Sequence, residues 1–193
     1  PARPAHRPPG DPGMDQLLSQ PLFAQLLGPA FARLEPPVRA LHDRHGTWRY
    51  AGQARVRRGQ HWLVPVLAWG ARLPPSHESL PTTVEFTASA RGERWARRFG
   101  RQPMQSRLWL HEGFLREQLG AVRFEFALDE RDGAIHWQAR RAWLFGLLPL
   151  PAGWFANVRC REYAVAGRYA FEVDVALPWV GPFIRYEGQL EPA

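Results

Sequence analysis

The sequence predicts a mainly β protein, an antiparallel up-and-down meander of about 9–10 strands that forms a curved sheet or a barrel. Two observations predict this class. From residue 46 onward, apolar and polar residues alternate with the period of two that places successive strand side chains on opposite faces. Short turns containing glycine separate the alternating stretches, as in β-hairpins. The 193 residues can bury roughly 70% of their unfolded surface, so no disulfide is needed.

The N-terminal part has a different composition. Residues 1–13 are rich in proline, arginine and glycine and contain no large apolar residue, so we expect a disordered tail or linker. A single β-rich domain then covers residues 14–193. It begins with short helices: Pro21 and Gly28 mark the first turn and the end of one helix, and a proline pair interrupts the next helical stretch, residues 29–43.

The strands follow in order along the chain. A first strand covers 47–58, hairpins pair 82–90 with 94–100, 103–110 with 114–120, 121–129 with 134–145 and 157–165 with 168–177, and a last strand covers 181–191. Because Gly120 leaves no room for a loop, we expect residues 114–128 to form one long strand bent at that glycine. Two apolar segments, near 60–72 and 150–157, are expected to cap an open end or edge of the sheet.

The alternation brings charged residues onto apolar faces. Trp95, Arg97 and Phe99 share one face of a predicted strand, and Glu117 and Arg141 fall among inward apolar residues of other strands. A buried isolated charge costs several kcal/mol, so these groups must pair, reach water or meet a ligand. Three interpretations remain open: a structural Arg–Glu pair with stems reaching a barrel mouth, a polar cluster that fixes the head group of an amphiphilic ligand, or a register slip that reverses the faces.

Histidine, cysteine and glutamate side chains elsewhere in the chain are candidates for metal binding or catalysis. His42 and His45 have a spacing conceivable for a metal, but an exposed polar helix end is favoured. Cys160 lies between two arginines, which would lower its pKa if it were exposed, although a buried, inactive cysteine is favoured. Glu162 and Glu172 are interpreted as members of surface ion pairs. We therefore assign no catalytic residue, no metal site and no cofactor.

Charge and hydropathy limit the partners. The net charge is +7, yet the arginines are spread along the whole chain and no nucleic-acid motif is present, so nucleic-acid binding is disfavoured. The most apolar runs, 61–70 and 143–155, are shorter than the roughly 20 residues of a spanning helix. They are expected to be a lid, an interfacial patch for an anionic membrane, or segments buried against the sheet. We expect a cytoplasmic protein, with peripheral association at the inner membrane as an alternative.

Several stretches together resemble a known family. They are "ERWARRFG", "SRLWL", "LREQLGAVRFEFAL", "WLFGLLPLP" and "VALPWVGPFIRYEG". Over roughly residues 20–190 the chain is similar to an uncharacterised bacterial domain, domain of unknown function 4166. The resemblance implies a fold type and no reaction. It also implies that such a domain occurs alone or C-terminal to a saccharopine-dehydrogenase-like NAD(P)-binding domain, which makes that domain a candidate partner.

The favoured function is a non-catalytic module that binds a lipid-like or other amphiphilic small molecule inside an apolar β cavity, or that associates with a membrane surface. The candidate ligand-binding residues are Arg97, Glu117, Arg141, Trp95, Phe99, Tyr50 and Tyr186. The alternatives are an enzyme or accessory domain of an NAD(P)-linked oxidoreductase system, and a structural interaction domain without a ligand. The ligand hypothesis predicts a cavity on the order of a few hundred Å³ inside the sheet.

Overall fold

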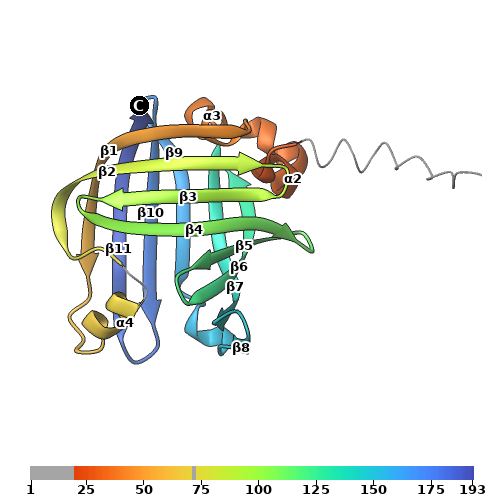
Figure 1. The fold of residues 1–193 in the computed structure, drawn as a ribbon. Coiled ribbons are helices and arrows are strands. Elements are labelled where there is room, and N and C mark those ends of the chain that lie inside the picture. The colour runs from red at the N-terminus through yellow and green to blue at the C-terminus, as the bar shows by residue number, and fades with distance from the viewer. Residues whose placement is uncertain (1–19, 71–72) are drawn as a thin grey trace, which may run out of the picture.

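A computed structural model describes residues 20–70 and 73–193. Within these ranges, ten antiparallel strands follow one another in the order β6-β5-β4-β3-β2-β1-β11-β10-β9-β7, and a pairing of β6 with β7 closes them into a barrel (Figure 1). The predicted meander is confirmed, and of the two predicted forms it is the barrel. The tail predicted for residues 1–13 lies outside the described residues.

Short helices cover one end of the barrel, the upper end in Figure 1. They are α2 (Leu22–Leu27), the 3-10 helix η1 (Gly28–Arg33) and α3 (Pro36–His42). Gly28, with φ of 54°, ends α2 as predicted, since glycine adopts this left-handed conformation without steric cost. The prolines at the start of α3 fit its first turn, where their missing N–H groups are not needed.

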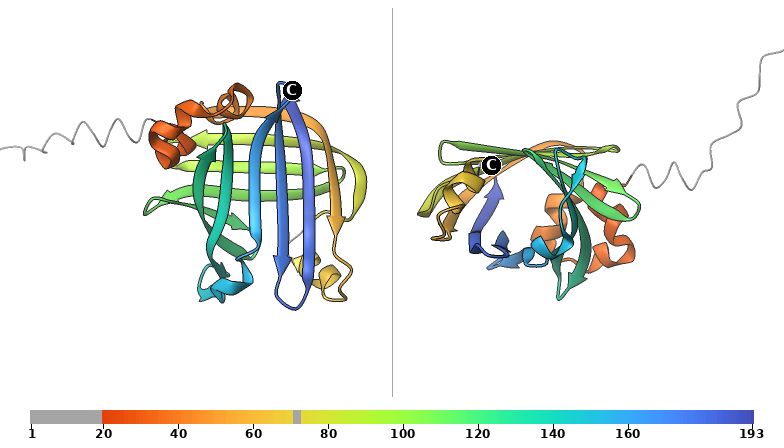
Figure 2. Two further views of the ribbon diagram at one scale, coloured as in Figure 1. Left: turned by 180° about the vertical axis from the view of Figure 1, so that it is seen from behind. Right: turned by 90° about the horizontal axis from the view of Figure 1, so that it is seen from below.

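Most strands agree with the predicted hairpins, although β2 begins at His77 and not at the predicted residue 82. They are β1 (Gly46–Arg58), β2 (His77–Ser89), β3 (Gly92–Phe99), β4 (Gln102–His111), β5 (Phe114–Leu119), β6 (Val122–Arg131), β7 (Ala134–Leu144), β9 (Val158–Val165), β10 (Arg168–Leu177) and β11 (Gly181–Pro192). Three short elements lie at the lower end (Figures 1 and 2): the helix α4 (Val64–Gly70), the two-residue strand β8 (Leu148–Pro149) and the 3-10 turn η2 (Ala152–Trp154). The two apolar segments therefore lie at one end of the barrel.

The single bent strand predicted for residues 114–128 is wrong. β5 and β6 form an antiparallel hairpin in which Leu119 is opposite Val122, so only Gly120 and Ala121 make the turn. Gly120 has φ of 54°. A two-residue hairpin turn needs positive φ, which a glycine adopts at no steric cost, so one glycine and one further residue are enough to reverse the chain.

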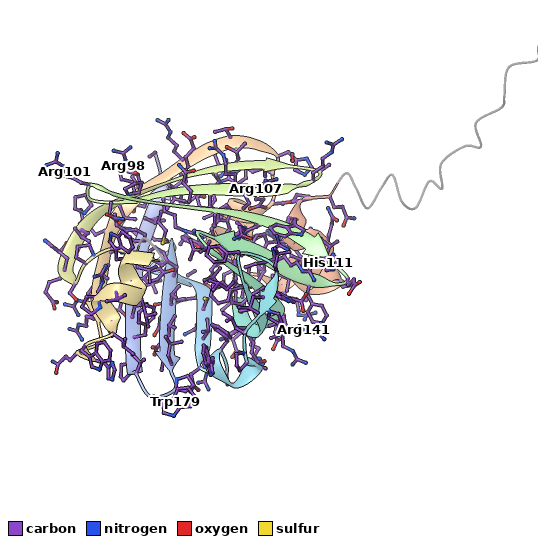
Figure 3. All side chains as sticks on the ribbon, turned by 60° about the horizontal axis from the view of Figure 1, so that its bottom comes forward. Arg98, Arg101, Arg107, His111, Arg141 and Trp179 are labelled. Carbon is purple, nitrogen blue, oxygen red and sulfur yellow. The ribbon has the colours of Figure 1, made fainter. Side chains whose placement is uncertain are left out.

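The inward position predicted for Arg141 is also wrong, because β7 contains a bulge. Opposite β6, Glu125 pairs with Arg141 while the next residue, Phe126, pairs with Ala139, so β7 has one extra residue between them. A single extra residue reverses the alternation beyond it. Ala139 and Ala142 are therefore buried, whereas the Arg141 side chain is 69% exposed and lies on the outer surface in Figure 3.

Apolar side chains fill the barrel as two separate clusters. The upper core joins the helices to the strands, and its largest members include Phe23, Leu41, Trp48, Phe86, Trp95, Leu115, Phe126, Ile135 and Trp137. The lower core lies at the α4 end and contains Ala54, Val56, Val64, Ala68, Leu73, Phe99, Met104, Phe183 and Ile184. The barrel interior is thus apolar at both ends, and polar residues lie between the two clusters.

Candidate ligand-binding site

A cavity of about 70 Å³ lies inside the barrel between the two cores. Its lining includes residues of the upper core, such as Trp95 and Trp137, and residues of or against the lower core, such as Phe99 and Tyr186. The remaining lining residues are Val84, Phe86, Arg97, Glu117, Leu119, Cys160, Arg161, Glu162, Tyr169, Phe171, Glu172, Val173 and Leu190. The cavity is smaller than the volume that the ligand hypothesis predicts, and it holds a few atoms beside the polar groups.

Arg97 lies inside the barrel, as the alternation along β3 predicts. Its guanidinium donates to the Ser106 hydroxyl at 2.8 Å and lies 3.5 Å from a carboxylate oxygen of Glu117. The guanidinium carbon is 4.7 Å from the centre of the Trp95 ring. The Arg97 and Glu117 side chains are only 13% and 10% exposed. The expected Arg–Glu pair therefore exists, and it faces a cavity.

The contacts leave this pair with hydrogen-bonding capacity. A close charge-assisted N–H···O bond measures roughly 2.7–2.9 Å, which is shorter than the distance between Arg97 and Glu117. Arg97 carries five N–H donors, of which one bonds the Ser106 hydroxyl and another makes a long hydrogen bond of 3.5 Å to Glu117. A polar group placed in the cavity would therefore find donors on Arg97 and acceptors on Glu117.

A second buried polar pair adjoins the cavity, and both of its members, His42 and Glu162, were predicted at the surface. The His42 imidazole lies 2.6 Å from a carboxylate oxygen of Glu162, and both side chains are buried. His42 was predicted at an exposed helix end, but α3 lies over the barrel end and its last turn faces inward, where His42 stacks on Phe23 at 3.7 Å. Glu162 was predicted on the surface, but its side chain is buried, and it is opposite Phe171 on β10. The alternation of β9, in which Val158, Cys160 and Glu162 share a face, could have identified it.

Glu93 is a third buried acid in this region, and it was not among the predicted site residues. It accepts a hydrogen bond from the Trp95 indole N–H at 2.7 Å. Burial raises its pKa, and the nearby His42 opposes this effect. Among the described residues, four buried side-chain atoms have no hydrogen-bond partner: Nδ1 of His42, Nε1 of Trp48, Oε1 of Glu93 and Nε1 of Trp137.

The thiol and two of the phenols that line the cavity, those of Cys160, Tyr169 and Tyr186, are held in their neutral forms. Burial raises the pKa of the Cys160 thiol, so the lowering by flanking arginines does not occur. Burial also raises the pKa of Tyr186, and burial followed by the Glu162 carboxylate raises that of Tyr169. Within residues 20–70 and 73–193, no group of three or more His, Cys, Asp or Glu residues has a metal-binding arrangement. These groups can position a ligand, but they do not form an activated nucleophile.

The predicted site residues are thus divided. Five of the seven candidates line the cavity: Trp95, Arg97, Phe99, Glu117 and Tyr186. Tyr50 is buried outside the lining, and its hydroxyl accepts a hydrogen bond of 3.4 Å from Arg44. Arg141 lies on the outer surface, where it is 3.9 Å from Glu125.

A larger hollow of about 470 Å³ lies mainly over β1 and β11 and is bordered by residues of β2, β9 and β10. It is lined by polar groups that already pair with each other. Arg55 contacts Glu78 at 2.8 Å, and Arg168 contacts Glu191 at 2.5 Å. Exposed pairs of this kind are solvated and recognise little by themselves, so the interior cavity is the better candidate for a binding site.

Comparisons with known proteins give a family and a similar solved structure. A search of curated proteins finds no match. The crystal structure of Rv2717c from M. tuberculosis is similar, with 10% sequence identity, a TM-score of 0.43, and coverage of 83% of this chain and 99% of that chain. In the part of the chain that the structure describes, no helix is long and apolar enough to cross a bilayer. A family model described as domain of unknown function DUF4166 matches residues 34–190, so the chain belongs to that family.

Proposed function

We propose that this domain is a non-catalytic module that binds an amphiphilic, lipid-like small molecule inside the barrel, with the polar end of the ligand beside Arg97 and Glu117. The observation that carries the proposal is the placement of this charged pair at a cavity between two apolar cores. A solely structural pair would be better enclosed by packed side chains, because an incompletely satisfied buried charge is costly.

The polar lining supports a ligand with a small polar end. Arg97 offers unused N–H donors, Glu117 offers acceptor oxygens, and Trp137 contributes an indole N–H that has no partner among the described residues. Most other lining residues are aromatic or aliphatic, as in sites where a few polar groups orient an apolar ligand.

The cavity volume restricts the ligand. A space of about 70 Å³ holds the polar end and not a whole chain. The lining residues Leu119 and Phe171 are only half-buried. Both pack against the lower core. In our proposal they move apart to admit the apolar part of the ligand.

The experiment combines native mass spectrometry with two double variants. Purified wild-type protein should carry a bound small molecule that is lost on denaturation, or should bind decanoic acid or decanol when these are added. The variant Arg97→Met with Glu117→Leu keeps the interior neutral and should lose this binding. The matched control, Arg168→Met with Glu191→Leu, removes an exposed pair on the outer wall and should bind as the wild type does. Equal binding by the interior variant, or no binding by wild type, would overturn the proposal.

Family resemblance adds a proposed partner. We propose that the domain works beside a saccharopine-dehydrogenase-like NAD(P)-binding domain in the bacterial cytoplasm. Co-purification of the domain with such a protein from its native host would support this pairing, and separate elution of the two purified proteins would contradict it.

A further inference from the structure

Large apolar side chains are exposed almost entirely at one end of the barrel. The lower end is formed by residues 59–70, 73–76, 145–157 and 177–182, which we call the lower rim (Figure 1). Nine of the ten large hydrophobic residues that are exposed in the described chain lie in it, and the tenth, Leu110, lies near the turn between β4 and β5. The aromatic ones are Trp62, Trp69, Phe145, Trp154 and Trp179. An apolar patch of this extent on one face marks an interaction site.

The large apolar side chains that are exposed in the lower rim are not packed into the barrel interior. Trp69 and Trp179 are 83% and 84% exposed, and Figure 3 shows Trp179 pointing away from the strands at this end. In α4, Val64 and Ala68 are buried against the barrel while Val66 and Trp69 face outward. A helix with apolar residues on all sides is usually covered on all sides. The barrel covers only one side of α4, so the apolar side chains on its other side are left without a packing partner.

The charge distribution indicates what covers this face. The four segments of the lower rim contain no Asp, Glu or Arg. Three arginines border them: Arg58 and Arg123 donate to the rim carbonyls of Pro74 and Gly146, and Arg159 is the second residue of β9, two positions after the rim. None of the three forms a salt bridge with a described residue. The lower rim is therefore an acid-free apolar surface backed by unneutralised positive charge.

We propose that the lower rim docks onto the surface of a phospholipid bilayer that contains anionic lipid. Tryptophan rings prefer the depth of the lipid head groups, and arginines just behind them attract anionic phosphates. A second copy of this chain fits less well, since a face-to-face dimer would bring the two sets of arginines together. This inference goes beyond the proposed function and does not depend on a ligand in the cavity.

The test is co-sedimentation with vesicles of phosphatidylcholine alone and with vesicles in which part of it is replaced by phosphatidylglycerol. Wild type should bind the anionic vesicles more tightly, and added salt should weaken that binding because it screens the arginines. The variant Trp69→Ser with Trp179→Ser should lose about tenfold or more of its partitioning, since binding strength scales with the apolar area inserted. Both side chains are exposed, so the circular dichroism spectrum should not change.

Two matched variants separate this proposal from its rivals. Leu110→Ser removes the exposed apolar residue outside the lower rim and should bind vesicles as wild type does. Arg97→Met with Glu117→Leu should also bind vesicles normally, so failure of the cavity proposal is distinguishable from failure of this one. Vesicle binding that the tryptophan variant retains, or no binding by wild type, would overturn the proposal. A dimer in light scattering that the same variant dissociates would assign the lower rim to a second copy and overturn it as well.

Discussion

Neutralising Glu117 tests the energetics of the interior charge pair. In the variant Glu117→Gln, the Arg97 guanidinium keeps its hydrogen bond of 2.8 Å to the Ser106 hydroxyl and its contact with the Trp95 ring. It loses the ion pair with the Glu117 carboxylate. Removing one partner of a buried ion pair costs about 3–5 kcal/mol. Because Ser106, Trp95 and the cavity still solvate the guanidinium, we expect the lower end, about 3 kcal/mol. For a chain of 193 residues this corresponds to a melting temperature lower by about 6–12 °C.

The double variant makes the same test sharper. Replacing both partners by apolar residues, in Arg97→Met with Glu117→Leu, removes the charges together and should leave the free energy of unfolding within about 1 kcal/mol of wild type or above it. Urea unfolding followed by tryptophan fluorescence and circular dichroism measures the free energy of unfolding of wild type, Glu117→Gln and the double variant. The control is Glu191→Gln, which breaks the exposed Arg168 pair and should cost less than about 1 kcal/mol. If Glu117→Gln cost no more than Glu191→Gln, the pair would be solvated and the interior assignment of Arg97 would be refuted.

Three further predictions concern His42, Glu93 and Gly188. His42→Ala removes the group 2.6 Å from Glu162 and should lower the free energy of unfolding by about 3–5 kcal/mol in urea, since a carboxylate stays buried without its partner; an unchanged midpoint would contradict this. Burial raises the pKa of Glu93 above its ordinary 4.5, so the folded state binds more protons and stability falls as pH rises through the window from 4.5 to the folded pKa. Glu93→Gln should abolish that fall, and a stability difference from wild type that does not vary with pH would refute it. In Gly188→Ala the added Cβ would lie 2.6 Å from the carbonyl oxygen of Gln53, and the overpacking should cost about 1–3 kcal/mol in thermal unfolding.

The alternation of apolar and polar residues, with a period of two, was sufficient to predict most strands of the barrel. Hairpins such as β9–β10, joined by Ala166 and Gly167, were predicted correctly because alternation and turn composition indicate the same boundaries. Arg97 and Glu117 were placed inside for the same reason, since no irregularity interrupts β3 or β5. The alternation did not say whether the sheet closes, because closure depends on the pairing of β6 with β7 and on strand tilt.

The misplaced residues share a physical cause: their positions depend on long-range contacts or on a local irregularity. The bulge in β7 has no strong local signal, since "QARRAW" contains no glycine, and it moved Arg141 outside. His42 is buried only because the helices pack over the end of the barrel, and Glu162 is satisfied by a residue 120 positions away. Neither of these long-range contacts can be recognised from the local pattern of apolar and polar residues.

The closed order of strands has a consequence for synthesis of the chain. β1 pairs with β2 and with β11, whose residues leave the ribosome last among the strands. Until they emerge, one side of β1 has free N–H and C=O groups that can pair with another nascent chain. Low translation temperature or a chaperone that covers this edge should therefore raise the yield of monomeric protein.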